Sequence, residues 1–185
     1  MHILETEQVV HAPLDEVFAF FGKPENLARI TPDWLGFGIL TPSPIPMREG
    51  ALIDYVVKLG PLPTRWRTLI TTFDPPHRFV DEQLSGPYDF WHHTHEFEAV
   101  PEGTLIRDTI RYRMPFGPLG RLARALVVRR QLEAIFAHRR RVIEEVFPSR
   151  AWESWRWGCL PSYPAPMSYP TARSARRRSP RSGPP

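Results

Sequence analysis

Two patterns of apolar and polar positions divide the chain. Alternation with a period of two dominates up to about residue 115, and helical spacing follows. Weak alternation predicts a first strand at Ile3–His11, and Trp34–Leu40 is a short candidate strand. Five further strands, each ended by a segment rich in Gly or Pro, are predicted at Gly50–Leu59, Thr64–Phe73, Arg78–Leu84, Tyr88–Val100 and Thr104–Met114. Because the gaps between these five are short, consecutive strands should pair antiparallel.

Helical spacing predicts two short helices and one long helix. The first short helix opens at Ala12-Pro13-Leu14-Asp15, and the second covers Glu25–Ile30. The long helix spans Leu119–Phe147, and its apolar stripe consists of Ala125, Val128, Leu132, Ile135, Phe136, Ile143 and Val146. The predicted fold class is therefore α+β: a curved antiparallel sheet of about seven strands around a long C-terminal helix, with the short helices closing one end.

Composition separates a body from a tail. The chain has 185 residues, which suits one domain at 1–147 and a tail at 148–185 that is rich in Pro and Arg. The tail holds eight prolines, and we expect it to be disordered; whether it has a function stays open. The seven arginines and one glutamate of the tail sum to a charge of +6. Since the formal net charge of the chain is +4, the body carries −2. The basic pI of about 9.6 is therefore weak evidence for nucleic acid, and no specific binding of it is expected.

Several classes of protein are excluded by what the sequence lacks. No apolar run reaches the roughly 18–20 residues that a membrane-spanning helix needs. The first ten residues have neither a basic nor an apolar region typical of a secretory signal. One cysteine excludes a disulfide framework and a metal site built from several cysteines. We therefore expect a cytoplasmic protein.

Local strings resemble a known superfamily. The segment DEQLSGPYDFWHHTHEFEAVPEGTLIRDTIRYRMPFGPLG contains the pattern D-x-Q…GP…W-x-H-x-H-x-F…G-T…D…Y…P-x-G, and Phe136-Ala137-His138-Arg139 resembles an F-x-x-R element. Residues 1–147 thereby resemble the START-like (SRPBCC, Bet v 1-type) helix-grip superfamily, in particular bacterial polyketide cyclase/dehydrase-like ligand-binding proteins. The resemblance implies an apolar cavity between sheet and long helix, and no common cofactor. It implies no single chemistry, since the fold hosts carriers, sensors, cyclases and interaction modules.

Strand alternation selects the side chains that face the helix. In Tyr88–Val100 the inward set is Trp91, His93, His95 and Phe97, and in Thr104–Met114 it includes Asp108 and Tyr112. A four-residue turn at Val100–Gly103 puts His95 opposite Asp108, whereas a slip of two residues puts His93 there. Either register sets an inward histidine beside an inward carboxylate, with Cβ atoms about 4.5–5.5 Å apart.

Arg139 is out of place in an apolar stripe. It lies between Ile135 and Ile143 on the predicted helix, and a buried guanidinium needs an anionic partner. Asp108 and Asp81 are the candidate partners. The alternative is that Arg139 binds a carboxylate or phenolate of a ligand.

These residues define a candidate site and three hypotheses for function. The ligand-binding candidates are Tyr55, Trp66, Asp81, Trp91, His93, His95, Phe97, Asp108, Tyr112, Phe136 and Arg139. The first hypothesis is binding of a small, largely apolar molecule that is lipid-, polyketide- or aromatic-like. The second is a cyclase/dehydratase in which His93, His95 and Asp108 move protons. The third is a protein-interaction module with a vestigial cavity.

Metal ions and cofactors are not expected at this site. A site of His93, His95 and Asp108 is geometrically conceivable, because the two histidines share a face and Asp108 can reach them. Successive inward residues of one strand are nevertheless awkward for a tight tetrahedral site, and no further ligand converges on these three. The expected partner is a small hydrophobic ligand, and a homodimer is left open.

Overall fold

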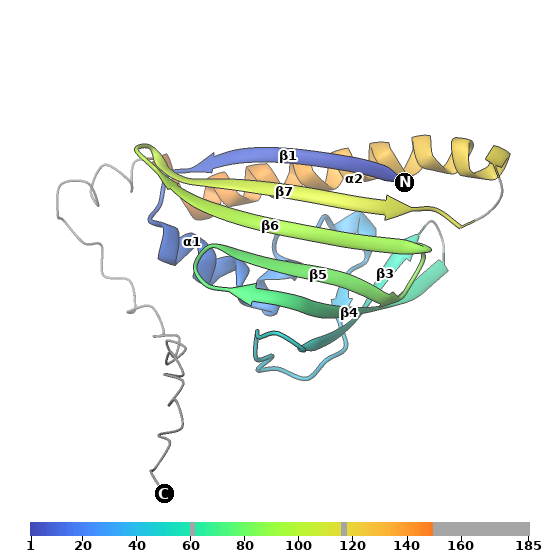
Figure 1. Cartoon of the computed structure of the whole chain (residues 1–185), viewed down its shortest axis with the longest axis horizontal. Coiled ribbons are helices and arrows are strands. Elements are labelled where there is room, and N and C mark those ends of the chain that lie inside the picture. The colour runs from blue at the N-terminus through green and yellow to red at the C-terminus, as the bar shows by residue number, and fades with distance from the viewer. Residues whose placement is uncertain (60–61, 116–117, 150–185) are drawn as a thin grey trace, which may run out of the picture.

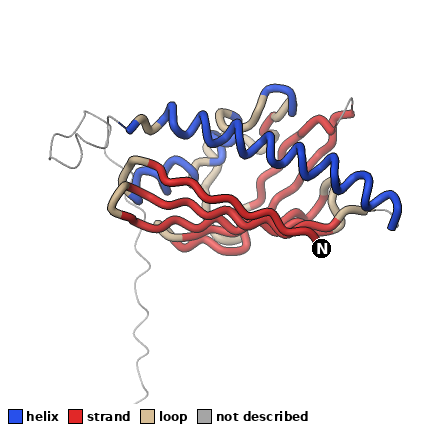
Figure 2. Tube along the Cα trace, turned by 90° about the horizontal axis from the view of Figure 1, so that it is seen from above, coloured by secondary structure: helices blue, strands red, loops and turns tan. Residues whose placement is uncertain are grey.

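One antiparallel sheet and one long helix form the framework of the computed structural model (Figure 1), which describes residues 1–59, 62–115 and 118–149. The elements are β1 His2–Val10, α1 Leu14–Phe21, the 3-10 helices η1 Pro24–Ala28 and η2 Asp33–Leu35, β2 Gly38–Ile39, β3 Leu52–Leu59, β4 Leu62–Asp74, β5 Arg78–Ser85, β6 Phe90–Val100, β7 Gly103–Arg113 and α2 Pro118–Val146. Across the described ranges, the sheet has seven strands in the order β1-β7-β6-β5-β4-β3-β2. Figure 2 shows α2 lying across one face of this sheet. The predicted fold class is confirmed; the predicted disordered tail falls, from residue 150 onward, outside the described residues.

The short candidate strand at Trp34–Leu40 is wrong over its first half. Asp33–Leu35 forms a single 3-10 turn, and Gly36 ends it in the left-handed region at φ 51°. Only Gly38 and Ile39 pair with β3. The reversal at Gly36 leaves too few residues for a longer strand.

The β6–β7 register follows the first of the two predicted alignments. Ala99 pairs with Thr104, and His95 pairs with Asp108. The turn depends on Gly103, whose φ is 140° and where a Cβ would collide with the carbonyl oxygen of Val10. A side chain there would meet the end of β1, so the glycine fixes both the turn and the approach of β1 to it.

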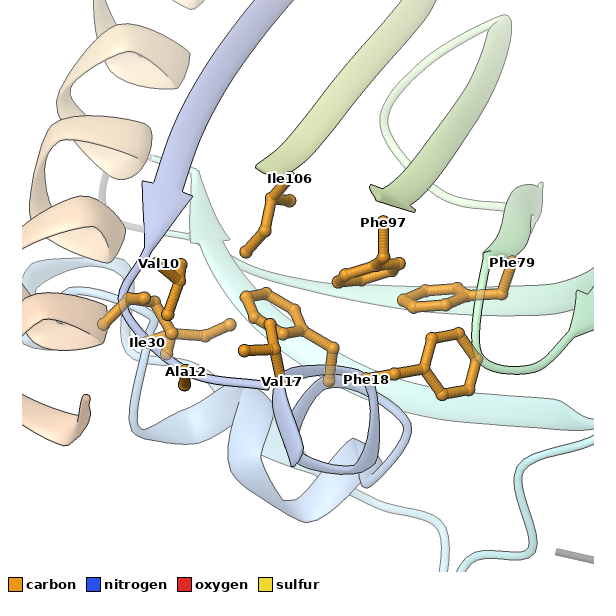
Figure 3. Packing of buried hydrophobic residues seen from close by; sticks show 10 residues of the cluster. Val10, Ala12, Val17, Phe18, Ile30, Phe79, Phe97 and Ile106 are labelled. Atoms are coloured by element: carbon orange, nitrogen blue, oxygen red, sulfur yellow. The ribbon is translucent and has the colours of Figure 1, made fainter. Parts of the chain in front are cut away.

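The aromatic core lies where α1 meets the sheet. Phe18 is fully buried, and its ring centroid lies 5.3 Å from that of Phe97 and 6.2 Å from that of Phe79. Figure 3 shows this packing with Ile106 and Val10 beside it. Burial of each such side chain stabilises the fold by about 1.5–3 kcal/mol. The cluster therefore closes one end of the space between sheet and helix.

Bulges in β4 accompany the curvature of the sheet. The pairing of β4 with β5 shifts between Arg67 and Thr68 and again between Ile70 and Thr72. A bulge bends its strand and increases the local twist.

Among the described residues, no helix is long and apolar enough to cross a membrane.

Candidate functional site

A cavity of about 210 Å³ lies between the sheet and α2. Its walls come from β3 to β7, from α2, and from the segment with η1 and η2. Eight of the predicted ligand-binding residues line it: Tyr55, Trp66, Asp81, Trp91, His93, His95, Phe136 and Arg139. The alternation of the strands and the apolar stripe of α2 thus direct these side chains into one space.

Three of the expected lining residues lie elsewhere. Phe97 is covered by α1, because Phe18 and Phe21 pack on it with centroids 5.3 Å away in both cases. Tyr112 packs in the core beside Trp91, with His2 5.2 Å from its ring. Asp108 faces a second cavity, which lies between β1 and α2. The first cavity is therefore shorter along β6 and β7 than the strand patterns predicted.

The sequence reasoning missed the wall formed by the short helices. Leu27, Ile30 and Leu35 line the cavity, as do Phe37 and Thr68. The sequence feature that could have identified these residues is the apolar spacing within 25–37, from which we predicted only that the short helices close one end of the fold. Their inclusion makes the cavity mostly apolar.

Two histidines and two carboxylates form the polar part of the wall. Nε2 of His93 lies 3.0 Å from Oδ1 of Asp108, and its Nδ1 lies 3.5 Å from Oδ2 of Asp81. Nε2 of His95 lies 3.0 Å from Oδ2 of Asp81. Its Nδ1 lies 2.7 Å from Oδ1 of Asp108, but out of line, so that within the described residues this nitrogen has no hydrogen bond. Each imidazole therefore has one nitrogen toward Asp81 and the other toward Asp108. We name these four side chains the His–Asp cluster.

The sheet pairing explains why the cluster forms. His93 pairs with Asp81 across β5 and β6, and His95 pairs with Asp108 across β6 and β7. All four positions face the same side of the sheet. The two imidazole centroids are 3.7 Å apart.

Burial and charge compete over the protonation of this cluster. Burial alone would raise the pKa of Asp108, but the Arg139 guanidinium, the hydrogen bond to His93 and the nearby His95 imidazole hold it well below its usual value. Burial, followed by repulsion from His95, lowers the pKa of His93. For His95 burial is outweighed by the close Asp108 carboxylate and by the hydrogen bond to Asp81 and the attraction of its charge, so the pKa of His95 is raised. Coupling to the carboxylates therefore dominates the pKa of His95, whereas burial and the neighbouring charge of His95 dominate that of His93.

Arg139 points inward and faces a carboxylate. It is 8% exposed, and its NH1 lies 3.5 Å from Oδ1 of Asp108. The guanidinium carbon lies 4.7 Å from the ring centroid of Phe21 and 5.3 Å from that of Phe136. Of the two candidate partners, Asp108 is therefore the one it meets. Arg139 also lines both cavities, so it borders space that a ligand can occupy.

One donor on the apolar side of the cavity has no partner. Nε1 of Trp66 is buried and, within the described part of the chain, makes no hydrogen bond. The neighbouring Tyr55 hydroxyl is satisfied by Thr68 at 3.1 Å. A ligand with one acceptor on this side would satisfy the indole N–H.

Residues 10–136 match the sequence profile of the family described as "Polyketide cyclase / dehydrase and lipid transport". No curated protein sequence matches the chain significantly.

Solved structures share the fold at low sequence identity. TTHA0849 from Thermus thermophilus is 17% identical, with a TM-score of 0.61 over 78% of this chain and 99% of that one. Ms6760 from Mycobacterium smegmatis is 16% identical, with a TM-score of 0.59 over 80% of this chain and 92% of that one. Ara h 8.0201 is 15% identical, with a TM-score of 0.52 over 78% of this chain and 98% of that one. At these identities the likeness concerns the fold, which is the helix-grip fold.

Proposed function

The chain belongs to the polyketide cyclase/dehydrase and lipid transport family, and on that premise we propose that it binds a compact, largely apolar molecule in the cavity between the sheet and α2. The observation that carries the proposal is the cavity itself, with a mostly apolar wall and a few polar groups. This combination is typical of small-molecule sites. Hydrophobic ligand binding is also consistent with the family and its fold.

The size and polar fixtures of the cavity narrow the ligand class. At about 210 Å³ the cavity is smaller than the roughly 300–1,000 Å³ common for ligand pockets, which favours a one- or two-ring molecule over a long lipid. Arg139 would bind a carboxylate or phenolate of the ligand, because its guanidinium faces the cavity and is not saturated by Asp108. Trp66 would donate to an acceptor at the apolar side.

Native mass spectrometry of freshly purified protein tests this proposal. Gentle conditions should retain a small molecule that denaturing conditions release. Ile53→Phe fills the cavity and should abolish the retained mass, whereas Leu52→Phe changes the neighbouring outward residue, which is 48% exposed, and should keep it. If no molecule is retained by the wild type, 2-naphthoate is titrated while tryptophan fluorescence is followed. Absence of both retained ligand and saturable quenching would refute the proposal.

A second candidate function is catalysis of the cyclase/dehydratase kind. The observation that favours it is that His93, His95 and Asp81, three members of the His–Asp cluster, line the ligand cavity, where an imidazole can transfer a proton to a bound ketone or alcohol. Turnover of a β-polyketone that His95→Gln abolishes while binding persists would establish this function. Binding without any turnover would leave the carrier or sensor function.

Three expectations accompany the proposal as predictions. They are a cytoplasmic location, the absence of specific nucleic-acid binding, and a monomer or homodimer as the assembly. The vestigial-cavity hypothesis is disfavoured by the open space beside the His–Asp cluster. The same native mass spectra report the assembly.

A further inference from the structure

We propose that Asp81, His93 and His95 form a binding site for a divalent transition-metal ion of the Zn²⁺ type, with Asp108 as the outer acceptor that orients both imidazoles. The proposal is independent of the small-molecule ligand. It replaces the expectation that no ligand beyond Asp108 converges on the two histidines. Asp81, from the neighbouring strand β5, is that further ligand.

The arrangement of ligand atoms fits such an ion. One ligand atom from each of the three residues lies within 4.8 Å of the others. Oδ2 of Asp81 is 3.0 Å from Nε2 of His95 and 3.5 Å from Nδ1 of His93. With metal–ligand bonds of about 2.1 Å, these two separations correspond to angles of roughly 90–115° between Asp81 and each histidine at the ion, a range that includes the tetrahedral value. The three residues come from two adjacent strands, so the sheet holds them in this arrangement.

The close approaches within the His–Asp cluster also outnumber the N–H groups that its histidines supply when neutral. The two imidazoles make four close nitrogen–oxygen approaches to carboxylates, but two neutral imidazoles carry only two N–H groups. Without a metal ion, Nε2 of His93 is hydrogen-bonded to Asp108 and Nε2 of His95 to Asp81, so both N–H groups are used. A metal ion bound to Nε2 of His95 would take the place of the proton that faces Asp81, and the imidazole would then carry its proton on Nδ1, which lies 2.7 Å from Asp108.

Asp108 and Arg139 supply the surroundings that such a site needs. A histidine that binds a metal usually donates its other N–H to a carboxylate or carbonyl, which fixes the tautomer. Here Asp108 lies at 3.0 Å from His93 and 2.7 Å from His95 on the side away from Asp81. With neutral imidazoles, the two carboxylates and Arg139 carry a formal charge of −1, so a divalent cation enters a buried site of opposite sign. The three ligand residues all line the cavity, which leaves a further coordination position facing it.

Binding of Co²⁺ to the full chain tests the site. The protein is stripped with a chelator and used in a Cys159→Ser background, because Cys159 is the only thiol. We expect one Co²⁺ per chain, with the strong visible absorption of a four- or five-coordinate ion, and displacement by one equivalent of Zn²⁺. Asp81→Asn and His95→Gln should weaken binding by more than the roughly 10–100-fold that Asp108→Asn, as an outer-shell change, should cost.

A matched control separates this site from surface histidines. His92 is the neighbouring outward residue and is paired with the exposed Glu82 at 3.0 Å, so His92→Ala removes a histidine–carboxylate pair of similar composition. This variant should bind Co²⁺ as the wild type does. Circular dichroism in the near ultraviolet shows whether each variant is folded.

A measurement on the wild type covers the case in which an inner variant fails to fold. Bound Co²⁺ should shift the indole N–H signal of Trp91, which lies 3.3 Å from Oδ1 of Asp81, and leave that of the exposed Trp34 in place. The proposal is overturned if the stripped wild type binds no stoichiometric Co²⁺, or if binding depends on His92 and leaves the Trp91 signal unchanged.

Discussion

Replacing Arg139 by Met tests whether a buried ion pair anchors α2 to the His–Asp cluster. The change keeps most of the side-chain volume and removes the charge beside Asp108. The charges are 3.5 Å apart, so their attraction at an effective dielectric constant of about 20 is about 5 kcal/mol. Breaking one half of a buried pair typically costs about 3–5 kcal/mol, because the other charge is left uncompensated. We expect a loss of unfolding free energy in this range at pH 8.

The loss should shrink when the pH falls toward 5.5. Without the guanidinium, the adjacent histidines supply the positive charge beside Asp108, so the folded-state pKa of His95 should rise further. A histidine whose folded pKa is raised stabilises the fold below its unfolded pKa of about 6.5, and this stabilisation is lost as the pH rises through the folded pKa. At pH 5.5 the protonated imidazole therefore replaces part of the missing charge.

Urea unfolding of the chelator-treated protein at the two pH values is the assay. Arg140→Met is the matched control, since Arg140 follows Arg139 on α2 and makes an exposed hydrogen bond to the carbonyl oxygen of Glu7. It should cost less than about 1 kcal/mol. Adding Asp108→Asn to Arg139→Met should recover much of the loss, because the orphaned carboxylate is its source. If Arg139→Met stays within about 1 kcal/mol of the wild type at both pH values, the buried pair has no energetic role.

Three further predictions concern the turn, the titration and the tail. Gly103→Ala should destabilise the protein more than Gly50→Ala, for which we expect only about 1–3 kcal/mol of backbone strain because a Cβ there meets nothing within 4 Å. Equal losses of melting temperature in the two variants would contradict the close contact of Gly103 with β1. In metal-free protein, NMR should show His95 titrating above its ordinary pKa, and Asp108→Asn should lower that pKa; unchanged titration would mean that the two groups do not interact. Truncation after Phe147 should shift the melting temperature by less than about 4 °C, and a larger fall would show that the tail stabilises the body.

The sequence by itself determined the order of the elements and the face on which each strand residue lies. These are local properties: alternation separates inward His93 and His95 from outward His92, and the short turn ending at Gly103 sets the register of β6 and β7. Arg139 was identified as an inward charge for the same reason, since helical spacing places it in the apolar stripe.

Only the tertiary structure decided which inward residues share the cavity. Phe97 has the same alternation as Trp91, yet α1 covers it with Phe18, and no periodicity in β6 reports where a distant helix packs. Likewise, the sequence offered Asp108 and Asp81 equally as partners for Arg139. Because the curved sheet packs against α2, Asp108 is the one described carboxylate that lies within 3.5 Å of Arg139. The convergence of Asp81 with both histidines depends on the β5–β6 pairing across a loop whose geometry the sequence does not fix. Contacts of this kind come from packing between elements far apart in the chain, and so a single sequence identifies the candidate side chains but not their grouping.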